Sequence, residues 1–275
     1  MRVDAHQHFW KYDPQRDAWI TPEMQAIARD FSPDDLLPSL QANGIDACVA
    51  VQADQSDAET EYLLGLAESR DFIRGVVGWI DLRADDLERQ IRRYEGRSLL
   101  KGFRHIVQAE TDPEFTDKPE FLSGIRMIHR FGYTYDILIH QHQLPMAVRL
   151  VRNCPGQPFV VDHIAKPLIK RGEWQEWAKG MRTLAENPNV MCKVSGMVTE
   201  ADWRNWKADD FTRYLDVVTE AFGTDRLMYG SDWPVCLVAA DYSRQLEIVS
   251  GHFQRFAVDE QKALFGGNAR RFYSL

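Results

Sequence analysis

Residues 57–94 read DAETEYLLGLAESRDFIRGVVGWIDLRADDLERQIRRY, and this stretch decides the fold class. Its centre, residues 73–80, is a short apolar run with β-branched residues, which is typical of a buried strand. The flanking segments, residues 57–69 and 85–94, are longer and amphipathic, which predicts a helix on each side. A strand between two helices is the repeating unit of a parallel sheet.

The same alternation continues along the whole chain. Strands are predicted at residues 2–5, 47–52, 73–80, 99–106, 134–139, 159–161, 190–194 and 226–229. Helices are predicted between Ser32 and Asn43 and at residues 57–69, 85–94, 118–131, 144–153, 172–186, 209–222 and 241–256.

Eight such units are the number that closes a barrel, and 275 residues fit a barrel of about 250. We therefore predict an α/β fold, a distorted (β/α)8 TIM barrel, with residues 1–275 as a single domain. The alternative is an open doubly wound sheet. Eight strands without a Gly-rich phosphate fingerprint favour the closed barrel.

Composition excludes several classes of function. A net charge of −8 disfavours a sequence-independent grip on nucleic acid or on an anionic membrane, because both need concentrated positive charge. There is no apolar run of the roughly 18 residues that a membrane helix needs, and the first residues do not resemble a leader. Four dispersed cysteines indicate reduced, mostly buried thiols. We expect a cytoplasmic protein; the sequence leaves open whether it is a homo-oligomer.

Two stretches fit no strand-helix unit, residues 10–31 and 197–207. Both exceed the usual two to six residues or so of such loops, and both contain tryptophan. Barrel enzymes build specificity from loops of this kind, and aromatic faces can stack on the apolar side of a sugar. Six tryptophans in loops or at strand ends are candidates for this role, although some must pack structurally: Trp10, Trp19, Trp79, Trp203, Trp206 and Trp233.

Histidines gather where a barrel would place its active site. Six of the eight lie at or just beyond the C-terminal end of a predicted strand: His6, His8, His105, His140, His142 and His163. Those strand ends form the active-site face of a (β/α)8 barrel. We therefore expect several of these imidazoles to converge on one pocket.

The first strand ends in Asp4-Ala5-His6-Gln7-His8. Because side chains of a strand alternate, His6 and His8 point to the same side and could grip one ion or one oxyanion. The alternative is that the pair only makes local hydrogen bonds.

The last strand runs into Tyr229-Gly230-Ser231-Asp232. A carboxylate at the barrel mouth can ligate a metal or take a proton from water. The alternative role of Asp232 is to cap the turn or the next helix.

Strand six ends in a histidine, His163, which could orient or protonate a reacting oxygen, with Lys166 as a nearby cation. A buried, structurally satisfied histidine is the alternative. Strand five ends in a second pair, His140 and His142, of which His142 could simply face solvent.

Strand four ends in Arg104-His105, and alternation lets only one of them face the pocket. We choose Arg104, whose guanidinium suits a carbonyl or carboxylate, although a structural ion pair would suit it equally well.

Together these residues resemble the amidohydrolase superfamily. The resemblance covers essentially the whole chain and rests on DAHQHFW (residues 4–10), VVDHIAKP (160–167), YGSDWP (229–234) and GGNARRFY (266–273). Within the superfamily the sequence is most similar to the sugar-lactone hydrolases that include L-fuconolactonase and L-rhamnono-lactonase, alongside pyrone-dicarboxylate lactonase. The resemblance implies hydrolysis of a cyclic ester at a centre made of His6, His8, His163 and Asp232, with Asp232 as the base for water.

The resemblance also bears on a metal. A two-metal centre of this superfamily needs a carboxylated lysine at the end of strand four, but here Lys101 begins that strand, so a bridged site is not expected. A mononuclear site would use His6, His8, His140 and Asp232, a nitrogen and oxygen set that suits zinc. Relatives in the lactonase branch work without a metal, so the resemblance implies that zinc is not obligatory.

For the reaction we predict that Asp232 deprotonates water, that His6, His8 and Arg104 stabilise the oxyanion, and that His163 assists proton transfer. Arg104, His140, Lys166 and Trp79 are predicted to bind substrate. With only Arg104 and Lys166 as cations, the sequence favours a neutral sugar lactone over a dicarboxylate lactone. The rivals are a zinc-dependent decarboxylase and a non-catalytic sugar-binding barrel.

Overall fold

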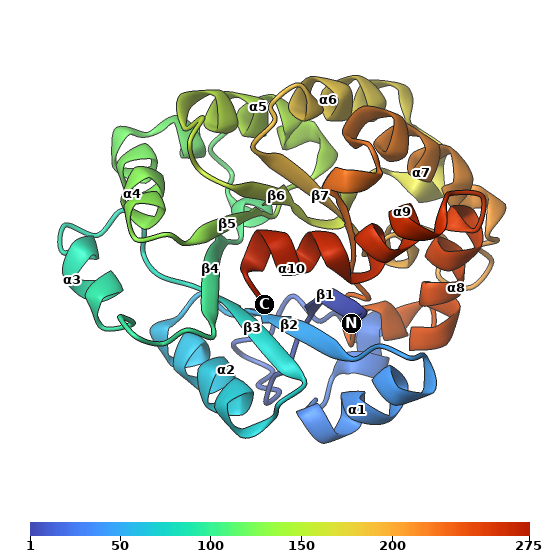
Figure 1. Cartoon of the computed structure of the whole chain (residues 1–275), viewed down its shortest axis with the longest axis horizontal. Helices are drawn as coiled ribbons and strands as arrows, with labels where there is room; N and C mark the ends of the chain where they lie inside the picture. The colour runs from blue at the N-terminus through green and yellow to red at the C-terminus, as the bar shows by residue number, and fades with distance from the viewer.

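The computed structural model describes residues 1–275. Eight parallel strands lie side by side in chain order, with helices around them, so the predicted (β/α)8 barrel is confirmed (Figure 1). The strands are β1 (Val3–Gln7), β2 (Ala47–Val51), β3 (Ile73–Gly78), β4 (Leu100–His105), β5 (Thr134–Ile137), β6 (Phe159–Val161), β7 (Val190–Val194) and β8 (Leu227–Tyr229). The ring closes between β1 and the segment after β8, where the His8 amide donates to Trp233 O at 2.7 Å.

Ten α-helices surround or cap the strands. They are α1 (Pro33–Ala42), α2 (Asp57–Ser69), α3 (Leu87–Arg92), α4 (Pro119–Arg130), α5 (Leu144–Asn153), α6 (Gln175–Ala185), α7 (Asp209–Phe222), α8 (Tyr242–Phe253), α9 (Val258–Lys262) and α10 (Asn268–Tyr273). The predicted strands and helices match within a few residues, because buried apolar runs and caps such as Ser32 mark them clearly. None of the helices combines the length and the apolar character that crossing a bilayer requires, and all four cysteines are free and buried.

A break in register near the end of β1 directs the first histidine inward. Asp4 pairs with Cys48 whereas Gln7 pairs with Ala50, so β1 holds one extra residue over this interval. Such a bulge changes which side chains face the barrel interior. Ala5 packs in the apolar cluster of the barrel interior. Its neighbour His6 also points inward, where its ring contacts the buried Asp162, although adjacent residues of a regular strand would face opposite sides.

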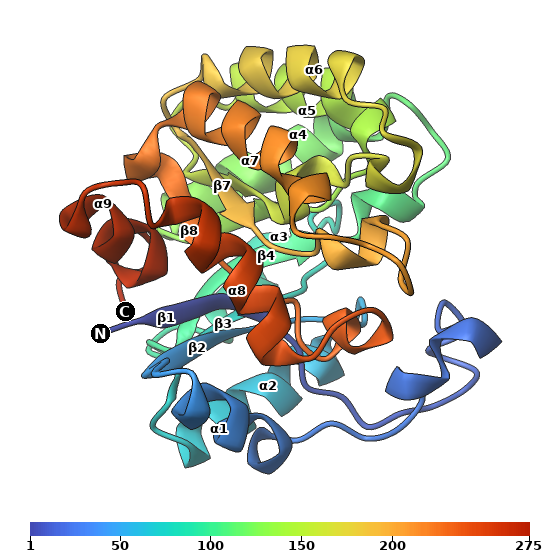
Figure 2. The ribbon, with the colours of Figure 1, turned by 90° about the vertical axis from the view of Figure 1, so that its right-hand side faces the viewer.

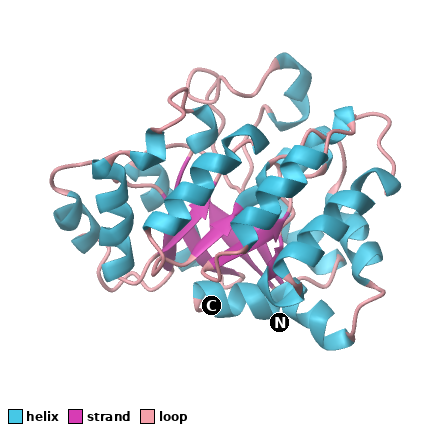
Figure 3. Ribbon diagram, turned by 90° about the horizontal axis from the view of Figure 1, so that it is seen from above, coloured by secondary structure: helices cyan, strands magenta, loops and turns pink.

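The N-terminal end of the barrel is closed by apolar packing. Alanine, valine and methionine side chains from six strands form one cluster with Ala269 and Tyr273 of α10. Figure 1 shows α10 lying across the middle of the ring, and Figure 3 shows it at the end of the strands where both chain termini lie. The interior is therefore a packed core on this side, and only the opposite end is open to a ligand.

The two long loops predicted from the sequence lie at the C-terminal end of the strands. The loop before α1 contains a short 3-10 helix, η1 (Pro22–Ile27), and the loop after β7 contains another, η7 (Val198–Glu200). Figure 2 shows the first of them, in dark blue, extending from the strand ends away from α10. An antiparallel bridge between Trp10 and Phe31 fixes the base of this loop.

Candidate active site

A cavity of about 480 Å3 opens at the C-terminal ends of the strands. Four buried polar side chains line it: His8, Arg104, His163 and Asp232. A larger groove of about 710 Å3 lies on the outside of the barrel between α7 and α8. The smaller cavity is the candidate site, because it alone of the two receives the converging imidazoles and the carboxylate.

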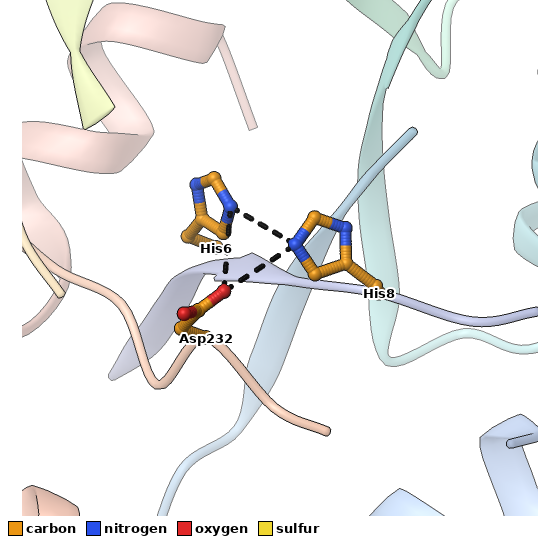
Figure 4. A group of neighbouring side chains, drawn as sticks. All are labelled: His6, His8 and Asp232. Carbon is orange, nitrogen blue, oxygen red and sulfur yellow. Dashed lines mark hydrogen bonds and ion pairs between the residues drawn. The ribbon is translucent and has the colours of Figure 1, made fainter. Parts of the chain in front are cut away.

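His6, His8 and Asp232 form a compact group where β1 meets the end of β8 (Figure 4). The Nε2 atoms of His6 and His8 are 3.2 Å apart. Asp232 Oδ1 lies 3.4 Å from Nε2 of His8 and 4.0 Å from Nε2 of His6. The Asp232 amide donates to His6 O at 2.8 Å, so the carboxylate is held by the same backbone that carries the histidine.

His163 completes the group from the segment after β6. Its Nε2 lies 3.8 Å from Asp232 Oδ1, and its ring centroid is 4.3 Å from that of His6. Its Nδ1 lies 2.9 Å from Ser195 Oγ, just after β7. The neighbouring Gly196 has φ +63°, and a Cβ built there would lie 2.5 Å from Nδ1 of His163. Only glycine therefore leaves room for the ring.

The backbone that carries His163 is strained. His163, Ile164, Ala165 and Lys166 have φ between +47° and +58°. Left-handed conformation is rare outside glycine and costs roughly 1–2 kcal/mol for each residue. Trp177 Nε1 donates to Ile164 O at 2.7 Å and anchors the turn. Such strain persists where the surrounding packing enforces it, and it concentrates at functional sites.

Arg104 lines the cavity and also forms the ion pair that the sequence left open as its alternative role; its binding of substrate stays a prediction. Nη1 donates to Asp162 Oδ2 at 3.0 Å and lies 3.3 Å from His6 Nε2, and Nη2 donates to Gln52 O. The next residue, His105, faces the outer layer, where its ring stacks on Phe115. Alternation along β4 therefore acts as predicted.

A buried ion pair network beneath the cavity escaped the sequence analysis. Lys193 of β7, fully buried, lies 2.5 Å from Asp136 Oδ2, 3.0 Å from Asp162 Oδ1 and 3.1 Å from His6 Nδ1. The Tyr273 hydroxyl donates to Asp136 at 2.8 Å. One feature of the sequence could have indicated this network: Lys193 is the single charged residue in an otherwise apolar strand, Val190-Met191-Cys192-Lys193-Val194. A charge in such a strand is buried and must therefore pair with another charge in the interior.

Burial and neighbouring charges set the protonation of the site. Burial lowers the pKa of His6 and of His163 well below the ordinary value, although Asp162 and Asp232 oppose the effect. Both rings are therefore neutral at neutral pH. Burial raises the pKa of Asp232, but the rings of His163 and His8 outweigh it, so the pKa of this carboxyl lies below its usual value. Asp232 is ionised at neutral pH.

Two overlapping sets of donors could hold a metal ion, His6 with His8 and Asp232, and His6 with Asp162 and His163. His8 donates from Nδ1 to Val51 O at 2.7 Å, which leaves Nε2 as the free donor atom facing His6. Metal-binding histidines are commonly oriented by such a bond.

The structure does not bring His140 into either donor set, contrary to the expectation from the sequence. β5 ends at Ile137, and the chain turns into a short 3-10 helix directly after His140. The His140 ring instead stacks on His142, with 5.8 Å between centroids. The inward residue of β5 is Asp136, which pairs with Lys193, so this strand contributes no residue to either donor set.

Trp79 also lies outside the cavity lining. Its backbone is held by Thr60, whose Oγ1 accepts from the Trp79 amide at 2.8 Å, and its Nε1 donates to His105 Nδ1 at 3.5 Å in the outer layer. The predicted aromatic wall comes from other tryptophans, Trp10, Trp19 and Trp203, which line the cavity together with the predicted cation Lys166. Both long loops thus contribute to the cavity.

Comparison with known proteins agrees with this architecture. Residues 3–275 match the sequence profile of the family described as Amidohydrolase. An L-fucono-1,5-lactonase of Burkholderia multivorans is 40% identical, over 100% of this chain and 96% of that protein. An L-fucono-1,5-lactonase of Burkholderia ambifaria is 36% identical over the same shares. A crystal structure of an amidohydrolase from Burkholderia multivorans with bound zinc is 40% identical and superimposes with a TM-score of 0.96, covering 100% of this chain and 99% of that chain.

Proposed function

The chain belongs to the amidohydrolase family, and we propose that it is a lactonase that opens a sugar lactone to the corresponding sugar acid. The observation that carries the proposal is the meeting of Asp232 with three imidazoles at the strand ends, two of which, His8 and His163, line the cavity together with Asp232. Full-length relatives that are L-fucono-1,5-lactonases support the same reaction class.

Asp232 acts as the general base in this proposal. Lactone hydrolysis begins when water attacks the ring carbonyl and loses a proton. The ionised carboxylate of Asp232 can accept that proton, since its pKa is held below the usual value. Its buried position among three imidazoles also limits the water that competes for it.

The negative charge that develops on the carbonyl oxygen when water attacks needs positive or donor groups nearby. Arg104 lines the cavity, and its Nε is buried without a partner in the protein. Arg104 can polarise the carbonyl and stabilise the developing charge, whereas His6 and His8, whose Nε2 atoms face each other, would contribute through a metal ion if one is bound. Because Arg104 is fixed by Asp162, this donor is oriented before substrate binds.

His163 is placed to give a proton to the departing ring oxygen. The ring is neutral, and Ser195 fixes its Nδ1 side, so Nε2 faces Asp232 and the cavity. A proton taken by Asp232 from water can pass to His163 and then to the leaving alkoxide. This route returns both groups to their starting states after each turnover.

The site also fits zinc. The separation of 3.2 Å between the Nε2 atoms of His6 and His8 is close to the roughly 3.3 Å expected for two ligands of a tetrahedral zinc ion. His6, His8 and Asp232 are the residues that would hold the ion. When bound, zinc supplies Lewis acidity and lowers the pKa of bound water. Arg104, 3.3 Å from His6 Nε2, offers positive charge at the same place without a metal.

The charges of the cavity favour a neutral substrate. Each cation of the cavity lining has an acid beside it: Arg104 pairs with Asp162, and Lys166 lies near Glu200. No cation is left in excess to bind the carboxylates of a dicarboxylate lactone. The tryptophans of the wall suit the apolar faces of a sugar ring.

A panel of lactones assayed with a pH indicator tests the proposal. We expect acid release from neutral aldonolactones such as L-fucono-1,5-lactone and much less from 2-pyrone-4,6-dicarboxylate. Parallel assays with a strong chelator, then with zinc restored, show whether the metal is needed. Failure to hydrolyse any lactone, combined with chelator-sensitive release of CO2 from an aromatic carboxylate, would favour a decarboxylase instead.

A further inference from the structure

Two charged side chains face the cavity from neighbouring loops without a direct bond between them. Lys166 follows β6 and Glu200 ends η7, and both line the cavity. Lys166 Nζ and Glu200 Oε1 are 3.9 Å apart, which is beyond hydrogen-bond distance. Each side chain is 19% exposed, so most of its surface is removed from solvent.

Neither charge is satisfied by the protein. None of the hydrogen bonds of the chain reaches the Glu200 carboxylate or the Lys166 ammonium group, and Lys166 donates only from its backbone amide, to His163 O at 2.8 Å. Burial raises the pKa of Glu200, and Lys166 only partly offsets it. A ligand that forms hydrogen bonds with these mostly buried, unpaired charges gains binding free energy.

The same cavity contains two further polar atoms without partners. Arg104 Nε and Gln108 Oε1 are buried and unpaired, and both residues line the cavity. With the Lys166 ammonium group and the Glu200 carboxylate, the cavity lining therefore offers both a donor and an acceptor that have no hydrogen-bond partner in the protein. A ligand whose groups both donate and accept matches this set, and hydroxyl groups have that property.

The two chain segments that carry Lys166 and Glu200 have well-defined backbone conformations. Lys166 is the last residue of the left-handed turn that carries His163. On the other side, Thr199 Oγ1 donates to Gly196 O at 2.6 Å, and Trp203 Nε1 donates to Thr199 O at 2.8 Å. The backbone of both residues is therefore set before a ligand arrives, and binding needs to order only their side chains.

We propose that Glu200 and Lys166 bind ring hydroxyls of the substrate and so make the enzyme selective for polyhydroxylated lactones over unsubstituted ones. Glu200 accepts from one hydroxyl, and Lys166 donates to the oxygen of a hydroxyl beside it. Glu200 also disfavours a carboxylate at this position on the ring. The inference rests on the proposed lactonase function and adds the residues that select the substrate.

The test compares L-fucono-1,5-lactone with δ-valerolactone, which has no ring hydroxyls, in the wild type and in Glu200→Gln. We expect wild type to prefer the hydroxylated lactone strongly. Glu200→Gln should lower kcat/KM for L-fucono-1,5-lactone by about 100-fold, because a buried charged acceptor is lost. Turnover of δ-valerolactone should stay within about a factor of two. Lys166→Met should also lower kcat/KM for L-fucono-1,5-lactone, and it provides a second variant if Glu200→Gln fails to fold.

Glu220→Gln is the matched control, because Glu220 is exposed on α7 and pairs with Arg182 at 2.9 Å, remote from the cavity. Glu220→Gln should leave the hydrolysis of both L-fucono-1,5-lactone and δ-valerolactone unchanged. Equal losses on both lactones, or no loss on either, in folded variants would overturn the inference while leaving the lactonase proposal intact. If wild type hydrolyses neither lactone, the proposed function itself fails, and the inference fails with it.

Discussion

Asp232 is the carboxylate that contacts all three imidazoles of the site, at 3.4 to 4.0 Å from His6, His8 and His163. Asp232→Asn keeps the size of the side chain but removes its basicity. We expect kcat for lactone hydrolysis to fall by about 10²–10⁴-fold, with little change in the melting temperature. Steady-state kinetics and thermal melting measure both. Turnover near that of wild type in the folded variant would remove Asp232 from the role of base.

Lys193 does not line the cavity, yet its loss should strongly destabilise the fold. Its removal leaves Asp136 and the Oδ1 side of Asp162 without their cation in the barrel interior. We expect Lys193→Met to lower the free energy of unfolding by about 3–5 kcal/mol, measured by urea denaturation.

The double variant Asp136→Asn with Lys193→Met separates charge from packing. It removes one negative charge together with the positive one, and Asp162 still has Arg104 at 3.0 Å. We expect the double variant to be more stable than Lys193→Met alone, a non-additive result typical of residues in one network. If the double variant is the less stable of the two, the cost of losing Lys193 lies in its packing and not in the unpaired acids.

At the scale of elements, the short segment after β7 shapes the site through a glycine. Gly196→Ala places a Cβ 2.5 Å from His163 Nδ1, at φ +63°. Gly172→Ala is the matched control, because Gly172 has φ +67° but nothing within 4 Å of a new Cβ. Both should lose about 1 kcal/mol of stability from the left-handed backbone.

Only Gly196→Ala should displace His163, so only this variant should lower kcat for lactone hydrolysis. The extra loss of stability relative to Gly172→Ala measures the steric contact. Equal kinetics in the two variants would show that the His163 ring can shift without cost, and the position of this imidazole would then not limit the reaction.

Element order and strand positions could be predicted from the sequence, because a buried apolar strand between amphipathic helices leaves a clear pattern. The positions of His6, His8 and Asp232 at strand ends followed from that order. What the pattern could not give was the local geometry beyond the strands. The helical turn after His140 and the bulge in β1 arise from backbone conformations that have no period in sequence.

The buried partners of the site could be seen in the sequence only in part. Lys193 and Asp136 stand out as charges inside apolar strands, but which charges meet depends on strand register. Alternation predicted only that Arg104 and His105 face opposite sides, and Arg104 was chosen as the inward residue for its chemistry; the structure has Arg104 inward and His105 outward. The requirement for glycine at position 196 could not be predicted, because it comes from the His163 ring, which follows a different strand.

At the scale of the whole molecule, the site exists only when the ring is closed. Asp4 Oδ1 accepts from the Ser231 amide at 2.9 Å, and Asp4 Oδ2 accepts from the Tyr242 hydroxyl at 3.0 Å, which ties β1 to the segment after β8 and to α8. His6 and Asp232 come from these two ends of the barrel. The geometry of the catalytic group is therefore a property of the complete fold, and the stability of the fold limits activity.

The stability of the whole chain should depend on pH through Glu59, a buried acid in α2. Its Oε1 accepts from the Ala53 amide at 3.0 Å, yet burial raises its pKa to about 7. Since the folded state holds this proton more tightly than the unfolded state does, stability falls as pH rises above about 4.5 and the loss is complete above about 7. Gln in place of Glu59 is neutral at every pH and removes this loss.

We therefore expect Glu59→Gln to gain stability over wild type progressively between pH 4.5 and pH 7, by up to roughly 3 kcal/mol. Urea denaturation at several pH values measures the difference. Glu61→Gln, at an exposed position of the same helix that pairs with Arg97, controls for the loss of one negative charge. A difference between Glu59→Gln and wild type that stays constant from pH 4.5 to pH 8 would mean that Glu59 is ionised in the folded protein throughout. In that case the hydrogen bond from the Ala53 amide and the charge of Arg16, which both lower the pKa of Glu59, together stabilise the carboxylate more than burial destabilises it.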